Sequence, residues 1–181
     1  MPKQVDHEER RAEIDRVVWT IIAEDGIAAV TLRAIAARGG ISMGRVQHYF
    51  PTREAIVAHA LTSYLTLAEQ ANPVPDDRDA ALLMLLTHAI PRDGTQRLGA
   101  KVWYAYLAEA VTDPGLRTIV NEALRGAEDL ATGLLAGDRD RARVLLAAAD
   151  GLAYRALIGV VTADEAEAAV RALAGVSPGS G

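Results

Sequence analysis

The residues best suited to chemistry lie between Thr31 and Arg53, in a window that contains Arg33, Arg38 and Arg45 but no Asp or Glu. The chain as a whole carries a net charge of −5, so this basic window stands out against an acidic background. Guanidinium groups bind phosphates and can donate two hydrogen bonds to the edge of a guanine base. No HExxH, paired-carboxylate or Ser/His/Asp spacing accompanies them. The chemistry that this window predicts is therefore recognition of DNA, not turnover of a substrate.

Two short helices with a glycine turn between them must position these side chains. Thr31 stands where a helix N-cap is expected, and Gly39-Gly40 ends the first helix. Ser42 caps a second helix over 43–50, and Pro51 closes it. This spacing is typical of a helix-turn-helix, whose second helix reads the major groove.

The second helix divides into a core face and a reading face. Val46 and Phe50 fall together at 100° per residue and are expected to be buried. Gly44, Arg45 and His48 fall on the opposite face, where Gly44 would let the backbone approach DNA. The candidate DNA-contacting residues are Thr31, Arg33, Ser42, Met43, Gly44, Arg45, Gln47, His48, Tyr49, Thr52 and Arg53. Within this set we expect Arg45 to read a base edge and Arg53 to contact a phosphate.

The window resembles a known family. The run Ile41-Ser42-Met43-Gly44-Arg45-Val46-Gln47-His48-Tyr49-Phe50-Pro51-Thr52-Arg53 is similar to the recognition-helix signature of TetR-type transcriptional regulators, and Leu32 to Ala36 extends the match backwards. The family often has Tyr where this chain has Gln47, and Lys where it has Arg53. More weakly, 103–114 and Asp150-Gly151-Leu152 resemble the C-terminal domain of the BetI-like branch. The resemblance implies a DNA-binding regulator, usually a repressor.

Composition agrees with a helical protein that is not embedded in a membrane. Half of the 181 residues are apolar, and the chain has no cysteine, which excludes thiolate metal sites and Cys nucleophiles. The N-terminus is charged instead of resembling a signal peptide, and the apolar stretch 144–163 carries Asp150 and Arg155. We therefore expect a cytoplasmic protein without cofactor or metal. Residues 1–55 carry equal numbers of basic and acidic side chains, so the negative charge belongs to the remainder.

Apolar residues recur with helical period along the whole chain, which predicts an all-α fold. Besides the two short helices, the expected helices cover roughly 8–25, 53–71, 77–90, 94–111, 114–136, 139–161 and 164–174. The expected domains are a three-helix DNA-binding domain at 1–55, a helical ligand-binding and dimerisation domain at 56–175, and a disordered tail at 176–181.

An aromatic cluster in the second domain is the candidate effector pocket. The helix around 101–111 is apolar on nearly every side, which predicts that it is buried and that its aromatic polar groups find partners inside. A packed core is the alternative for any single residue, and a cage for a cationic ligand is a further possibility. The candidate ligand-binding residues are Tyr64, Met84, His88, Trp103, Tyr104, Tyr106, Leu107 and Tyr154.

The last two helices carry more apolar surface than a peripheral hairpin needs, which favours a symmetric four-helix interface between two copies. A helix pair packed only within its own subunit is the alternative. A homodimer would let two recognition helices reach the half-sites of a palindromic operator. The candidate interface residues are Leu145, Ala149, Leu152, Ala153, Ala156, Leu157, Val160, Ala169, Val170 and Leu173.

Three classes of function compete on these observations. The best supported is a transcriptional regulator, acting as a repressor, that a small-molecule effector releases from its operator. An all-α enzyme is opposed by the scattered positions of His7, His48, His59 and His88. A ligand carrier without DNA binding would share the pocket but bind no operator.

Overall fold

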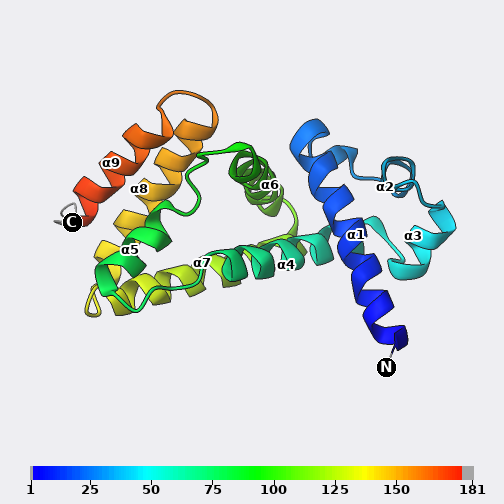
Figure 1. The fold of residues 1–181 in the computed structure, drawn as a ribbon, viewed down its shortest axis with the longest axis horizontal. Helices are drawn as coiled ribbons and strands as arrows, with labels where there is room; N and C mark the ends of the chain where they lie inside the picture. Colours follow the sequence, from blue (N-terminus) through cyan, green and yellow to red (C-terminus); the bar gives the residue numbers. More distant parts are fainter. Residues whose placement is uncertain (1, 177–181) are drawn as a thin grey trace. The chain divides into compact units, whose positions relative to one another are not determined.

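The computed structural model describes residues 2–176, and every regular element in that range is helical (Figure 1). The elements are α1 Pro2–Asp25, the short 3-10 helix η1 Ile27–Ala29, α2 Leu32–Gly39, α3 Met43–Tyr49, α4 Arg53–Ala71, α5 Arg78–Thr87, α6 Gly94–Ala110, α7 Pro114–Leu134, α8 Arg139–Leu157 and α9 Ala163–Ala174. The all-α prediction is confirmed. No helix of this range is both long enough and apolar enough to cross a lipid bilayer.

Side chains at the N-termini explain where the helices begin. The oxygens of Thr31, Ser42, Asp77, Asp138 and Thr162 each accept a hydrogen bond from the backbone N–H three residues later. Such caps satisfy donors that the first turn leaves unpaired. At Thr162 the cap is reciprocal, because Glu165 also accepts from the Thr162 N–H.

Arginines bind the last carbonyls of the five helices from α5 to α9. The donor and acceptor residues are Arg92 to Thr87 in α5, Arg117 to Ala110 in α6, Arg78 to Leu134 in α7, Arg97 to Leu157 in α8, and Arg141 to Ala174 in α9. These carbonyls have no partner within their own helix, and a positive charge there also complements the helix dipole. The arginine caps therefore satisfy carbonyls that the last turns of these helices leave unpaired.

Some helix ends differ from the expected positions. Helix α1 begins at Pro2 instead of near residue 8, and α8 ends at Leu157 instead of 161. Gly159 has φ +80°, a conformation that suits glycine and does not continue an α-helix. Of the expected tail, Val176 packs on the hydrophobic core of α8 and α9, and 177–181 lie outside the described residues.

The chain divides into two compact units, and the expected domain boundary at residue 55 stays a prediction. The first unit comprises Met1–Ala68 and Lys101–Val120, and the second comprises Glu69–Ala100 and Asn121–Gly181. The first unit extends beyond the expected three-helix DNA-binding domain at 1–55, called the head below, because most of α4 and the second half of α6 share its core. Ile56 and Leu61 of α4 and Val102 and Tyr106 of α6 are completely buried there.

The second unit is built around α5, α8 and α9, which pack on one another (Figure 1). Its core consists largely of alanine and leucine, with Ala142, Ala153 and Ala166 completely buried. Small side chains allow helices to approach closely. Glu167 of α9 accepts from Arg92 and Arg171, and these two arginines hold the pKa of its carboxyl below its usual range.

Candidate functional site

The helix-turn-helix forms as expected, because local capping and two buried side chains fix it. The Thr31 hydroxyl accepts from the Ala34 N–H at 3.0 Å, and the Ser42 hydroxyl accepts from the Arg45 N–H at 3.2 Å. Gly40 takes φ +63°, which ends α2 in a left-handed turn. Val46 is 0% exposed and Phe50 is 3% exposed, so the predicted core face of α3 is confirmed.

The opposite face of α3 is open to solvent. Met43, Gly44, Gln47 and His48 are all exposed, and a Cβ added at Gly44 would meet no atom within 4 Å. This face presents an amide, an imidazole and a methyl-bearing side chain next to an open stretch of backbone. These are the groups that can follow base edges in a major groove.

His7 of α1 lies beside this face, which the sequence did not reveal. Its ring centroid is 5.8 Å from that of His48 and 5.2 Å from that of Tyr49. Tyr49 is half-buried and also contacts His48 edge-on. The three rings come from two helices, and no sequence spacing links position 7 to positions 48 and 49.

The positive charge of the window is less available than its sequence suggests. Arg38 forms ion pairs with Glu24 and Asp25 at the end of α1, so two acids from outside the window neutralise it. Outside the window, Arg11 of α1 lies over the Phe50 ring, 5.4 Å from its centroid, in a cation–π contact. Arg33 and Arg45 remain exposed.

Arg53 is engaged inside the head. Its Nε donates to the Val30 carbonyl at 2.8 Å, and its Nη2 donates to the Ile27 carbonyl at 2.9 Å. The side chain thus joins the first turn of α4 to both the start and the C-cap of η1. The expected phosphate contact stays a prediction, but these two bonds give Arg53 a structural role that the sequence did not indicate.

Replacing Arg53 with alanine should therefore destabilise the head. Loss of the two charge-assisted hydrogen bonds should lower the free energy of unfolding by about 2 kcal/mol, as hydrogen bonds to charged groups do. Urea unfolding of the variant and of Arg33→Ala, which removes an exposed arginine from the same window, measures the effect. Equal stability of the two variants would contradict the structural role.

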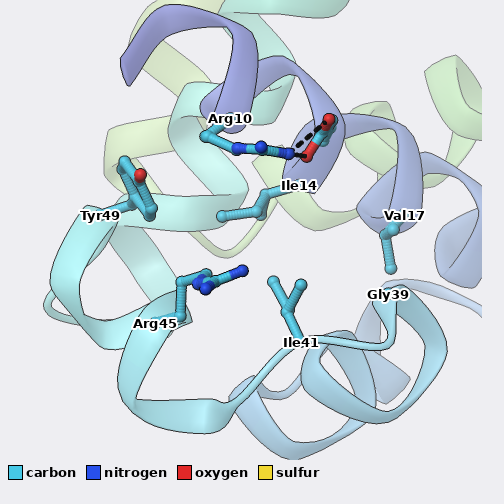
Figure 2. A pocket seen from close by; sticks show the side chains of 8 residues that line it. Arg10, Ile14, Val17, Gly39, Ile41, Arg45 and Tyr49 are labelled. Atoms are coloured by element: carbon cyan, nitrogen blue, oxygen red, sulfur yellow. Dashed lines mark hydrogen bonds and ion pairs between the residues drawn. The ribbon is translucent and has the colours of Figure 1, made fainter. Parts of the chain in front are cut away.

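A small hollow lies between α1, the turn after α2, and α3 (Figure 2). It measures about 40 Å³. Ile14, Val17 and Ile41 form its apolar wall. Arg10, Glu13, Arg45, Tyr49 and Gly39 complete the lining.

The candidate effector residues are divided between the two units. Tyr64, Trp103, Tyr104, Tyr106 and Leu107 belong to the first, and Met84, His88 and Tyr154 belong to the second. In the first unit Trp103 stacks on Tyr64 with ring centroids 6.5 Å apart, and Trp19 meets Tyr64 edge-on. Burial raises the pKa of Tyr64 to about 12.

Tyr106 does not fit the expected role as a pocket residue. Its side chain is completely buried, and its hydroxyl donates to the Val57 carbonyl of α4 at 3.0 Å. The prediction that α6 is buried on nearly every side is also wrong, since Leu98 and Lys101 are exposed. Besides Ala100, the buried residues of α6 are Val102, Tyr106 and Ala110, and these three pack on the core of the first unit along one side of the helix.

In the second unit the exposed His88 acts electrostatically on the carboxylate of Asp150. Although Asp150 has exposed atoms, burial of its carboxyl group raises the pKa, and the charge of His88 opposes this increase. Among the residues described, no cluster of three or more His, Cys, Asp or Glu side chains is placed to hold a metal ion.

The expected dimer seam needs correction. Leu145, Ala149, Ala153, Ala156 and Val170 are at most 5% exposed and belong to the core of the second unit. They cannot present a surface to a partner, because they pack on their own chain. Of the expected residues, Val160 and Leu173 are more than half exposed. Val144 and Ile158, which the prediction left out, are 66% and 56% exposed.

Comparisons with known proteins agree with both halves of this description. The family described as "Bacterial regulatory proteins, tetR family" matches residues 19–60, and the family described as "BetI-type transcriptional repressor, C-terminal" matches residues 78–175. The HTH-type transcriptional regulator PksA of Bacillus subtilis is 31% identical over 117 residues, which are 61% of this chain and 56% of PksA. The match thus spans little more than half the length of that relative.

Solved structures share the fold over nearly the full chain. A transcriptional regulator from Rhodococcus sp. Rha1 superposes with a TM-score of 0.83 at 26% identity, covering 91% of this chain and 94% of the other. A regulator from Saccharomonospora viridis, solved in complex with choline, has the same TM-score at 24% identity, covering 94% and 97%.

Proposed function

The chain belongs to the TetR family of bacterial transcriptional regulators, with a BetI-type C-terminal domain, and on this premise we propose that it is a repressor that binds a palindromic operator as a homodimer. A small-molecule effector releases it. The protein is a regulator and not an enzyme, and it acts in the cytoplasm, where the operator is. The observation that carries the proposal is the exposed polar face of α3, which Val46 and Phe50 hold outward from a rigid core.

Base reading in this proposal belongs to the outermost side chains of α3. Gln47 and His48 stand next to each other on the exposed face, and both can form hydrogen bonds with base edges. Thr31 and Ser42 begin α2 and α3, and the backbone N–H groups at such helix starts favour phosphates. The residues that contact bases and those that contact phosphates should respond differently to substitution.

The proposal is tested first by the operator itself. Genomic fragments that the purified protein retains should contain a palindromic site, and affinity for that site should fall as salt rises. His48→Ala should reduce the free energy of binding to the operator by about 1–3 kcal/mol while leaving binding to unrelated DNA unchanged. Fluorescence anisotropy with both DNAs measures this, with Thr62→Ala on the exposed part of α4 as the control. Retention of no fragment at low salt would refute the proposed function.

The partner surface of the homodimer is the exposed apolar face of α8 and the connection to α9. Val144, Gly151, Tyr154 and Ile158 recur at helical spacing along one exposed side of α8. Val160 and Leu173 add apolar surface after α8 and on α9. Two copies related by a twofold axis can cover this face with its own counterpart, which fits the symmetry of a palindrome.

A cationic effector is favoured by aromatic residues of the first unit and by the relatives. The S. viridis regulator was solved with choline, and the multidrug binding protein EbrR was solved with ethidium. The stacked aromatic rings of Tyr64 and Trp103 in the first unit are the kind of group that attracts a cation. We propose that these two residues, with Tyr104 and Leu107 of the same unit, contribute to the effector site.

A further inference from the structure

The hollow beside the recognition helix carries an inference that rests on the proposed function and extends it. We propose that Arg10, Arg45 and Tyr49 form a seat for one phosphate of the DNA backbone. Arg10 then becomes a DNA-contacting residue on α1, and Arg45 contacts the backbone instead of a base edge. Figure 2 shows the two guanidinium groups and the phenol ring around the same hollow.

The charges at the rim favour an oxyanion. Among the described residues the Arg45 guanidinium has no hydrogen-bond or ion-pair partner, and its side chain lies at the hollow. Glu13 is the acidic residue of the lining, and Arg10 already neutralises it through contacts of 2.8 and 2.9 Å. Both members of that pair are 46% exposed, and exposed pairs of this kind contribute little stability. A phosphate can therefore bind the Arg10 guanidinium together with Glu13 or in place of it.

The size and the wall of the hollow favour a backbone phosphate over other ligands. A volume of about 40 Å³ is far below the roughly 300 Å³ or more of small-molecule pockets, so an effector does not fit. The apolar wall of Ile14, Val17 and Ile41 excludes water and strengthens the attraction between charges at the rim. It also suits the carbon atoms of a deoxyribose, which a free phosphate lacks.

The arrangement explains why Arg45 differs from its neighbours on α3. Gln47 and His48 stand on the exposed face without lining the hollow, whereas Arg45 and Tyr49 line it from α3. A seat built from α1 and α3 fixes both helices against one strand of the duplex. Contacts of this kind set the register of the reading helix and carry no sequence information.

The salt dependence of DNA binding tests the seat directly. Arg10→Ala should reduce the slope of log K against log salt by about 0.9, the value for one phosphate contact, and should weaken operator and unrelated DNA by the same factor. Arg45→Ala should do the same. Arg16→Ala is the matched control, because it removes an exposed arginine from α1 that does not line the hollow, and its slope should equal that of the wild type.

The outcomes separate this inference from the proposed function. If the wild type binds its operator but Arg10→Ala and Arg16→Ala give the same slope, the seat is refuted and the regulator proposal stands. If Arg45→Ala weakens only the operator, Arg45 reads a base and the seat is refuted. If the wild type binds no DNA, the proposed function itself fails.

Inorganic phosphate distinguishes the two sources of the same chemical group. Exchanging chloride for phosphate at constant ionic strength should change the operator affinity of the wild type and of Arg10→Ala by the same factor. If Arg10→Ala binds the operator as the wild type does in chloride, and only the wild type binds inorganic phosphate in the absence of DNA, the seat belongs to a free anion and the assignment to the DNA backbone is overturned.

Discussion

Replacing His59 with alanine should lower the free energy of unfolding by about 3 kcal/mol, the upper end of the cost of leaving a buried polar group without its hydrogen-bond partner. The reason lies in Asp15 of α1, which is 1% exposed. Its Oδ1 lies 3.0 Å from Nδ1 of His59 on α4, and its Oδ2 has no hydrogen-bond partner among the residues described. Without the imidazole, the carboxylate would be buried with no partner at either oxygen, which is costly.

Urea unfolding of two related variants distinguishes this cause from simple loss of packing. The double variant Asp15→Ala/His59→Ala should lose less stability than the sum of the two single variants. The reason is that Asp15→Ala removes the carboxylate that His59→Ala alone would leave without a partner. His48→Ala, an exposed histidine, should change stability by no more than about 0.5 kcal/mol. Strict additivity of the two single variants would show that the pair is not coupled.

The same pair should influence the recognition helix. His59 also meets the Phe50 ring edge-on at 5.0 Å, and Phe50 is the C-cap of α3. The contacts therefore run from Asp15 through His59 to the end of the reading helix. In a variant that stays folded but lacks the imidazole, the C-terminal end of α3 should be more mobile.

Replacing Ile158 with aspartate should convert the proposed dimer to monomers and lower operator affinity by about 100-fold or more. Ile158 is 56% exposed in one chain, so the change costs the monomer little. In a dimer the same charge would be buried against an apolar partner surface, and a buried unpaired charge is strongly unfavourable. A single reading helix also loses the contribution of the second half-site.

Analytical ultracentrifugation together with operator binding measures this effect. Val74→Asp is the control, because Val74 is 51% exposed but lies in the connection between α4 and α5, away from the proposed face. It should leave assembly unchanged. A dimeric Ile158→Asp variant with normal operator affinity would show that the copies meet elsewhere.

Features that depend on neighbouring residues could be predicted from the sequence. Thr31 and Ser42 cap their helices as expected, and Val46 and Phe50 are buried as the helical period indicates. Each of these depends on atoms within one or two turns of chain. Hydroxyl caps, glycine turns and apolar periodicity act over that range, so the sequence specifies them directly.

Features that depend on distant segments could not be predicted in the same way. Arg38 and Arg53 look equivalent in the sequence, but the fold brings acids to one and backbone carbonyls to the other. The pairing of Asp15 with His59 spans 44 positions and has no local signature.

The apolar stripes of the last two helices show the same limit. Periodicity identifies an apolar side but does not say whether it meets its own chain or another. Leu145 and Ala149 lie on the side that α8 buries in its own core, and Val144, on an adjacent side, is exposed.

The arginine caps on α5 to α9 have a consequence for chemical modification. Of the 19 Lys and Arg residues only Lys3 and Lys101 are lysines, and the five caps are all made by arginines. Acetylation and other acylations act on amines and do not reach a guanidinium, which also keeps its charge at any pH the fold survives. Lysine acylation therefore does not affect the ends of these helices. A dicarbonyl reagent directed at arginine would instead remove the caps at the ends of α5 to α9.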